Sequence, residues 1–244
     1  NAVKAGAVVI DNSSAFRMDP EVPLVVPEVN PQAILKHKGI IANPNCSTII
    51  MVMALKPIYD LAKIKRVIVS TYQAVSGAGK EGIDELDAQV RDHSEGREMT
   101  ANILPSASAE KHYPIAFNLI PQIDVFCDNL YTKEEMKMVN ETKKIMEDYE
   151  MRITATTIRV PVYRSHSESV NIELEKEVDL GAMREALAKF PGVTVQDDPS
   201  KQEYPMPLYT SEKDDVYVGR LRRDESCEKS YNIWVVGDQI RKGA

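Results

Sequence analysis

The strongest constraint on the fold is an alternation of apolar and polar side chains, which occurs in two consecutive segments. They cover residues 152–162 and 167–175, and a polar turn at 163–166 separates them. A period of two places every second side chain on the same face of a strand. We therefore predict two half-buried antiparallel strands that flank the turn.

In the rest of the chain, the spacing of apolar residues predicts helices that alternate with further strands. Thr132 and Glu135 form a capping-box pattern, which marks the start of one of the helices. Helices are predicted over 47–62, 80–97, 132–149 and 179–190, and strands over 5–11, 39–42, 65–75, 216–223 and 231–236. This mixture predicts an α/β or α+β fold, with a large mixed, mainly antiparallel sheet that helices cover on one face.

Composition narrows the functional class. The chain has 30 basic and 37 acidic residues, a net charge of −7 and no basic block, so nucleic acid is not an expected partner. The longest strongly apolar run, 49–55, is too short to cross a bilayer, and the first residues do not resemble a secretory signal. The three cysteines are too far apart for a disulfide framework or a metal clamp. We expect a cytoplasmic protein that handles small molecules and binds no metal.

Cys46 has the sequence setting of a nucleophile. It lies between the predicted strand 39–42 and the predicted helix 47–62, and Asn45 before it is a good N-cap. In the first turn of a helix, free N–H groups and the helix dipole favour thiolate over thiol. A buried apolar role is the common alternative for cysteine. Cys127 and Cys227 lack the setting of Cys46, and we treat both as structural.

The settings of His166 and Arg159 indicate further residues of the site that contains Cys46. His166 lies in the turn between the two alternating strands, a usual place for a functional loop. Arg159 lies in a strand whose other side chains are apolar or carry hydroxyl groups, where burial of a cation calls for an anion. Together they predict a carboxylate-bearing substrate beside an acid–base group.

Three further features have more than one interpretation. Gly77-Ala-Gly-Lys-Glu-Gly82 follows a strand and opens a helix, but no second strand with an acidic end follows, so we reject a dinucleotide fingerprint here. The loop could still hold an anionic or cofactor group through its backbone.

Arg17, in a hydroxyl-rich loop, suits either a phosphate site or an ordinary exposed arginine. Glu134 and Lys137 have the spacing of a surface ion pair.

Together these motifs resemble the bacterial aspartate-semialdehyde dehydrogenase family. The most specific are Asn43-Pro-Asn-Cys46-Ser-Thr and Arg159-Val-Pro-Val-Tyr-Arg-Ser-His166-Ser-Glu. Further matching segments follow the family's order over nearly the whole chain: 9–18, 71–79, 118–124, 134–137 and 234–239. The resemblance implies NADPH-dependent reductive dephosphorylation of L-aspartyl-4-phosphate to L-aspartate 4-semialdehyde through a cysteine thioester. It also implies a homodimer, a catalytic domain like the C-terminal domain of glyceraldehyde-3-phosphate dehydrogenase, and a place in lysine (through diaminopimelate), threonine and methionine biosynthesis.

The resemblance assigns catalytic and substrate-binding roles. Cys46 matches the nucleophile, His166 the acid–base residue and Gln73 the amide that orients the substrate. Arg159 matches the partner of the substrate α-carboxylate, and Glu134 matches the carboxylate near its amino group.

It also assigns a phosphate site and a cofactor site. Arg17 and Lys137 match the phosphate ligands, which replaces the surface-pair interpretation of Lys137. Ser76, Gly77 and Gln239 match contacts to the cofactor, NADP.

The family pattern divides the chain at residue 45. We expect 1–45 to be the tail of an NADP-binding Rossmann domain and 46–244 to be the catalytic, substrate-binding and dimerisation domain. A Gly-rich N-terminal segment and a C-terminal helix of the family have no counterpart here, so the cofactor site is expected to be incomplete. Two alternatives stay open: an N-acetyl-glutamyl-phosphate reductase, and a non-catalytic dimerising fragment that binds substrate.

Overall fold

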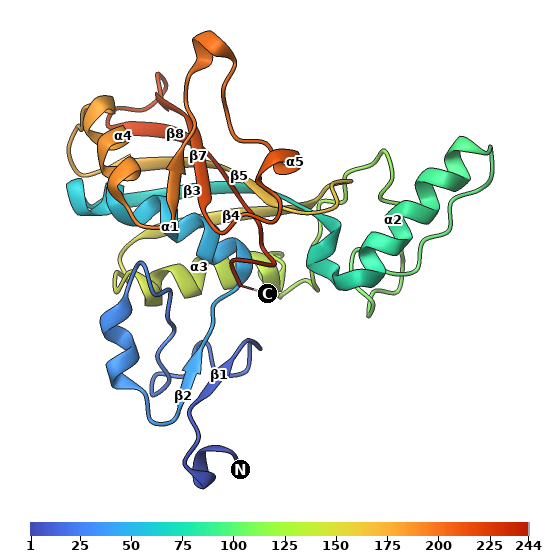
Figure 1. Cartoon of the computed structure of the whole chain (residues 1–244), viewed down its shortest axis with the longest axis horizontal. Helices are drawn as coiled ribbons and strands as arrows, with labels where there is room; N and C mark the ends of the chain where they lie inside the picture. The colour runs from blue at the N-terminus through green and yellow to red at the C-terminus, as the bar shows by residue number, and fades with distance from the viewer. Residues whose placement is uncertain (244) are drawn as a thin grey trace.

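A six-stranded mixed sheet forms the centre of the computed structural model, which describes residues 1–243 (Figure 1). The strand order is β4-β3-β5-β8-β7-β6. The strands are β3 (Ile64–Gln73), β4 (Arg152–Arg159), β5 (His166–Leu174), β6 (Val193–Val195), β7 (Val216–Arg223) and β8 (Ser230–Gly237). The β3–β4 and β6–β7 pairs are parallel and the other three pairs are antiparallel. The predicted mixed, mainly antiparallel sheet is confirmed.

The two alternating segments, now β4 and β5, are not neighbours in the sheet. They run in opposite directions as predicted, but β3 lies between them, parallel to β4 and antiparallel to β5. β5 is half-buried as predicted: from Glu168 to Leu174 buried side chains alternate with less buried ones, and only its first residues, at the site, are buried on both faces. The insertion of β3 brings the end of β3, the end of β4 and the start of β5 to one edge of the sheet.

Three helices cover one face of the sheet: α1 (Cys46–Leu61), α3 (Lys133–Ile145) and α4 (Leu180–Lys189). α1 is buried almost all round because it lies between the sheet, α3 and α4, which explains its continuous apolar sequence. A Cβ on Gly237 would lie 3.0 Å from Cγ1 of Ile50, so glycine at this position lets α1 approach β8 closely. The main apolar core lies between α1 and the sheet.

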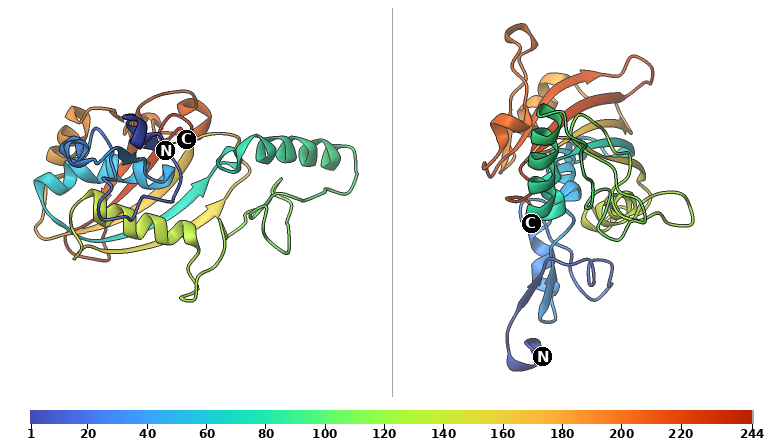
Figure 2. Two further views of the ribbon diagram at one scale, coloured as in Figure 1. Left: turned by 90° about the horizontal axis from the view of Figure 1, so that it is seen from below. Right: turned by 90° about the vertical axis from the view of Figure 1, so that its right-hand side faces the viewer.

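Two smaller parts extend from this body. β1 (Val9–Asp11) and β2 (Ile40–Ala42) form a parallel pair beside the 3₁₀ segment η2 (Pro31–Lys36). On another side, α2 (Gly79–Ser94) and the long segment that follows it form an arm (Figures 1 and 2). The arm has its own apolar cluster, in which Leu86 packs near Leu104 and Ile115.

Some predicted boundaries were wrong. The helix predicted over 132–149 ends at Ile145, where Glu147 takes a left-handed backbone with φ 52°. Of the predicted strand 5–11, only β1 forms; β1 pairs with β2 alone, so the Ile10 side chain stays exposed. The short elements β6 and α5 (Pro207–Thr210) were not predicted.

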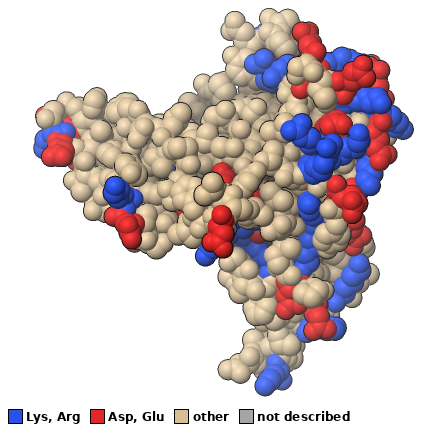
Figure 3. Space-filling model, turned by 180° about the vertical axis from the view of Figure 1, so that it is seen from behind, with Lys and Arg blue, Asp and Glu red and all other residues tan. Residues whose placement is uncertain are grey.

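Charged side chains are unevenly distributed over the surface. On the face in Figure 3 they gather along one edge, whereas the arm and the adjoining central surface carry few. Within residues 1–243 no helix has the length and apolar character needed to cross a membrane. The same residues hold no group of three or more His, Cys, Asp or Glu side chains placed to bind a metal ion.

We predict that Leu55→Ala in α1 lowers the free energy of unfolding by about 2–5 kcal/mol, because it leaves a cavity in the core. Leu55 is 0% exposed, whereas Leu35 is 87% exposed, so Leu35→Ala is the matched control and is expected to change stability by less than about 0.5 kcal/mol. Denaturant unfolding of both variants tests this, and equal effects would contradict the assigned core.

Candidate active site

The first turn of α1 presents Cys46. Asn45 is the N-cap, with extended backbone, and its Oδ1 accepts a hydrogen bond from the N–H of Thr48 at 3.1 Å. Cys46 therefore occupies the first helical position, as the sequence predicted.

Strand register places three predicted site residues in one row. Gln73 on β3 lies opposite Arg159 on β4, and Tyr72 lies opposite Ser167 on β5, so Gln73 comes next to His166. Side chains directly opposite each other share a face of the sheet. Arg159, Gln73 and His166 are all buried on that face.

The backbone of Ala74 holds the two ends of this row. Its N–H donates to Nδ1 of His166 at 3.0 Å, and its carbonyl accepts from Nη1 of Arg159 at 2.6 Å. A Cβ on Gly77 would lie 2.7 Å from Nη1 of Arg159 and 3.2 Å from Nε2 of His166. Glycine at 77 therefore lets the 3₁₀ turn η3 (Val75–Ala78) lie directly against both side chains.

The contact with Ala74 also fixes the protonation of His166. Because Nδ1 accepts a hydrogen bond, the proton of the neutral ring is on Nε2. Burial and the positive charge of Arg159 hold the pKa of His166 well below its ordinary value. His166 is thus a neutral ring whose Nε2–H can donate to an oxygen that gains negative charge.

Glu134 joins three elements at the centre of the site. It is 5% exposed, and its Oε1 accepts from Nδ2 of Asn45 at 2.9 Å and from Nε2 of Gln73 at 3.2 Å. Its Oε2 accepts from Nζ of Lys137 at 3.3 Å, and Nζ also donates to Asp124 at 3.0 Å. The Glu134–Lys137 pair is therefore partly buried and is not the surface pair that spacing alone suggested.

Arg17 reaches the same region from the loop after β1. It is 7% exposed, which rules out an ordinary exposed arginine. Nη1 donates to Glu141 at 3.1 Å, Nη2 donates to the carbonyl of Asn12 at 3.0 Å, and Nε has no partner among the described residues. Arg17, Lys133 and Lys137 line one cavity of about 340 Å³ together with Glu141. Three cations against one carboxylate leave a net positive charge, which suits an anion.

The three residues assigned to the cofactor also lie together. Nε2 of Gln239 donates to Oγ of Ser76 at 2.5 Å, and its Oε1 accepts from the N–H of Ser165, next to His166. Gly77 follows Ser76 in η3. The fold thus brings into one region the ten residues to which the family resemblance assigned roles.

Comparisons with known proteins decide the family. A sequence profile described as "Semialdehyde dehydrogenase, dimerisation domain" matches residues 55–242, and one described as "Semialdehyde dehydrogenase, NAD binding domain" matches 1–37. The aspartate-semialdehyde dehydrogenase of Aquifex aeolicus is 57% identical over 99% of this chain, and that of Bacillus subtilis is 54% identical over all of it. The chain belongs to the aspartate-semialdehyde dehydrogenase family.

Solved structures of the family agree with the fold. Aspartate semialdehyde dehydrogenase II from Vibrio cholerae superimposes with a TM-score of 0.93 at 48% identity, covering 99% of this chain and 70% of that protein. The crystal structure of the same enzyme complexed with ASA gives the same score and identity. The chain also spans 70% of the Aquifex and Bacillus relatives. Proteins of this name are oxidoreductases, and the match over 1–37 indicates a nicotinamide cofactor.

One expectation about Cys46 was wrong. The helix N-terminus was expected to favour the thiolate, but burial and then the negative charge of Glu134 raise the pKa of Cys46 to about 12. The N–H of Ser47 and the charge of Arg159 lower the pKa and do not offset this rise. Before substrate binds, Cys46 is therefore a protonated thiol.

Two buried carboxyl groups were missed. Glu141 follows Glu134 by seven residues, so the helical period already placed both on one face of α3. Glu168 follows His166 by two residues in β5 and therefore shares its face. Neither oxygen of Glu168 has a hydrogen-bond partner within residues 1–243, and burial raises its pKa well above the ordinary value.

We predict that Glu134→Gln lowers the pKa of Cys46, because it removes the negative charge that acts most strongly on the thiol. The pH dependence of Cys46 alkylation, with the labelled peptide mapped by mass spectrometry, measures this pKa. Glu135→Gln, a buried carboxylate on the same helix, is the control and should leave the midpoint unchanged. A midpoint that stays or rises in Glu134→Gln would contradict the electrostatic account.

Glu168→Gln should change the pH dependence of stability. Since the folded-state pKa of Glu168 is raised, its protonated form stabilises the fold below the unfolded-state pKa, and this contribution is lost as pH rises toward the folded value. The variant should match the parent near pH 4 and become relatively more stable with rising pH, by up to about 1.4 kcal/mol per unit. Urea unfolding across pH tests this, and parallel curves would show that Glu168 is ionised in the folded protein.

Proposed function

We propose that this chain carries the catalytic part of an NADPH-dependent enzyme that reduces L-aspartyl-4-phosphate to L-aspartate 4-semialdehyde. Residues 46–244 are the catalytic, substrate-binding and dimerisation domain, and 1–45 are the tail of the Rossmann domain. The observation that carries the proposal is the arrangement of charges around Cys46. A buried cation and a buried carboxylate, Arg159 and Glu134, lie near it, and a separate cationic cavity contains Arg17 and Lys137.

These charges are complementary to aspartyl phosphate. Nε of the buried Arg159 has no partner in the described part of the chain, so it is available to the α-carboxylate of the substrate. Glu134 is the partner for the α-ammonium group. The phosphate fits the cavity of Arg17 and Lys137, where Nε of Arg17 is also without a partner among residues 1–243. That a relative from Vibrio cholerae was crystallised with ASA supports a substrate of this class.

Substrate binding at Glu134 prepares the nucleophile. An ammonium group beside this carboxylate offsets the negative charge that raises the pKa of Cys46, so the thiolate becomes easier to form. The thiolate then attacks the acyl carbon: a C–S bond forms, the C–O bond to phosphate breaks, and phosphate stays at Arg17 and Lys137. The proton that the thiol gives up ends on the leaving group, which departs as hydrogen phosphate. Nε2–H of His166 donates to the carbonyl oxygen as charge develops there, and Gln73 orients the acyl group.

The cofactor has its proposed place beside Ser76, Gly77 and Gln239. The absence of a Cβ at Gly77 keeps the η3 backbone against Arg159 and His166, and Gln239 holds Ser76 beside it. When bound, NADPH supplies the hydride that reduces the thioester. Nε2–H of His166 donates to the oxygen of the thiohemiacetal. This oxygen then forms the C=O of the aldehyde, the C–S bond breaks, and His166 relays a proton from solvent to the sulfur, which restores the thiol of Cys46.

The charges of the site favour an aspartyl-phosphate reductase over the two alternative functions. N-acetyl-glutamyl phosphate has no ammonium group, so its neutral amide would bring Glu134 no positive charge beyond that of Lys137. A non-catalytic fragment would not need the buried row of Arg159, Gln73 and His166 beside a helix-terminal cysteine.

We further propose a cytoplasmic homodimer that serves lysine (through diaminopimelate), threonine and methionine synthesis. A dimerisation-domain profile covers 55–242, and the charge-poor surface in Figure 3 is suited to an interface. At α5, the apolar side chains of Met206 and Leu208 are exposed, and with Tyr163 they line a cavity of about 430 Å³.

We predict that Cys46→Ser lowers kcat with L-aspartyl phosphate by at least about 10³-fold, because it removes the nucleophile. Cys227→Ser is the control, since Cys227 is exposed and lies in no site. Full-chain enzyme is assayed with both L-aspartyl phosphate and N-acetyl-L-glutamyl phosphate. Faster turnover of the acetylated substrate, or an active Cys46→Ser variant, would overturn the proposal.

A further inference from the structure

Glu141 is a buried carboxylate that binds two different segments. Its side chain is 2% exposed. Oε1 lies 3.1 Å from Nη1 of Arg17, and Oε2 accepts from the backbone N–H of Asn45 at 2.7 Å. One carboxylate therefore connects the loop of the cationic cavity with the residue that precedes Cys46.

Such an arrangement is not explained by stability alone. Burial raises the pKa of Glu141, although Arg17 and the N–H of Asn45 oppose the rise. The cost of removing two charges from water often cancels the gain from a buried ion pair, and such pairs serve instead to define one arrangement of neighbouring groups. Here the neighbouring groups are a cation of the anion cavity and the start of the helix that carries Cys46.

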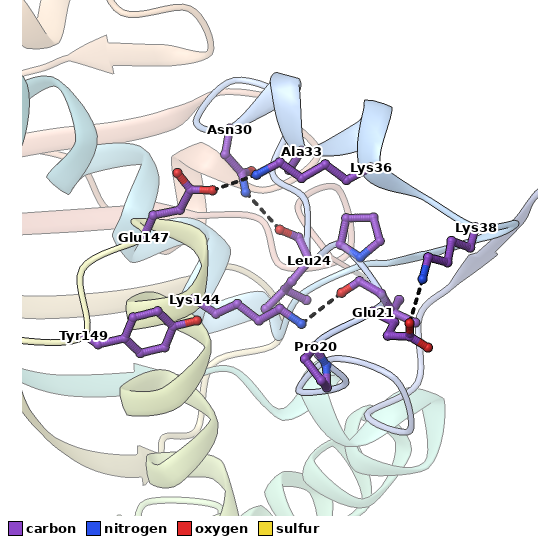
Figure 4. A pocket seen from close by; sticks show the side chains of 12 residues that line it. Pro20, Glu21, Leu24, Asn30, Ala33, Lys36, Lys38, Lys144, Glu147 and Tyr149 are labelled. Carbon is purple, nitrogen blue, oxygen red and sulfur yellow. Dashed lines mark hydrogen bonds and ion pairs between the residues drawn. The ribbon is translucent and has the colours of Figure 1, made fainter.

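The helix α3 also fixes the loop on which Arg17 lies. Glu134, Lys137, Glu141 and Lys144 follow one another at spacings of three, four and three, so they share one face of α3. Nζ of Lys144 donates to the carbonyls of Arg17, Asp19 and Val22 at 2.7–2.9 Å. Figure 4 shows Lys144 reaching from α3 to this loop, beside Pro20 and Glu21.

The loop is thus held at its backbone by Lys144 and at its guanidinium group by Glu141. The contacts to Glu141 and Asn12 use Nη1 and Nη2, which leaves Nε as the N–H without a partner in the described residues. An anion bound at Nε and the carboxylate of Glu141 then both interact with the positive charge of Arg17. The second oxygen of the same carboxylate binds the N–H of Asn45, so the effect reaches the residue next to Cys46.

We propose that Glu141 is a positioning residue that couples the anion site at Arg17 to the first turn of the Cys46 helix. This inference rests on the proposed function, in which Arg17 binds the phosphate and Cys46 is the nucleophile. Glu141 also lines the cavity of Arg17, but both of its oxygens are engaged by Arg17 and the N–H of Asn45. It therefore acts by setting the direction of the guanidinium group and the position of Asn45.

Glu141→Gln tests the coupling with little change of shape. Arg17 and the N–H of Asn45 bind different oxygens of Glu141. Glutamine replaces one of these oxygens with an NH2 group, so one of the two donors would face another donor. The probe is inorganic phosphate, and the readout is its protection of Cys46 from a small neutral alkylating reagent, mapped by mass spectrometry. We expect the half-protecting phosphate concentration to rise about tenfold, which corresponds to about 1.4 kcal/mol. The pH midpoint of Cys46 alkylation without phosphate should also shift.

Glu135→Gln is the matched control. Glu135 is a buried carboxylate of the same helix that also accepts two backbone N–H groups, those of Thr132 and Thr157. A merely structural role for Glu141 predicts similar losses of stability in both variants and no selective change at Cys46. The inference predicts that only Glu141→Gln changes phosphate protection and the alkylation midpoint, and that Glu141→Asp restores part of both.

Arg17→Leu separates the inference from the proposed function. If Arg17→Leu and Glu141→Gln both weaken phosphate protection and the double variant loses no more than Arg17→Leu alone, the coupling is supported. If Arg17→Leu weakens protection but Glu141→Gln behaves like Glu135→Gln, the inference is wrong and the proposed phosphate site stands. If Arg17→Leu keeps full protection, the phosphate role of Arg17 fails, and the inference fails with it.

Discussion

The position of Asn45 between two carboxylates of α3 is the constraint on which the site depends. Its side chain binds Glu134, its backbone N–H binds Glu141, and its own oxygen caps the helix that begins at Cys46. These contacts fix the first turn of α1 relative to α3. Through Gln73, Glu134 also connects this turn to the edge of the sheet where Arg159 and His166 lie.

Burial gives this site its electrostatic character. It raises the pKa of Cys46 and lowers that of His166, so the unliganded site holds a thiol and a neutral imidazole rather than an ion pair. The same burial leaves Nε of Arg159 without a partner among residues 1–243. A substrate that brings an ammonium group to Glu134 and a carboxylate to Arg159 compensates these charges. In the proposed function, the nucleophile is thereby activated by the molecule that it attacks.

Much of the site could be predicted from the sequence because its signals are local. The Asn45 cap and the position of Cys46 follow from helix-start chemistry, and Arg159 and His166 from their places in and beside alternating strands. Gln73 was assigned by the family resemblance alone. Two results could not be predicted in this way. The insertion of β3 between β4 and β5 is a long-range pairing, and the raised pKa of Cys46 depends on how α3 and the sheet enclose it. Glu141 was missed although its helical spacing from Glu134 was visible, because its two partners lie about a hundred residues away.

The central claim is that Cys46 accepts an acyl group from a substrate held by Arg159 and Glu134. The most direct measurement is the intact mass of the full chain after mixing with L-aspartyl phosphate in the absence of reduced cofactor, followed by peptide mapping. The account predicts one aspartyl group per chain, attached to Cys46 and released by hydroxylamine as expected of a thioester. An unmodified chain, or an aspartyl group on any other residue, would contradict it.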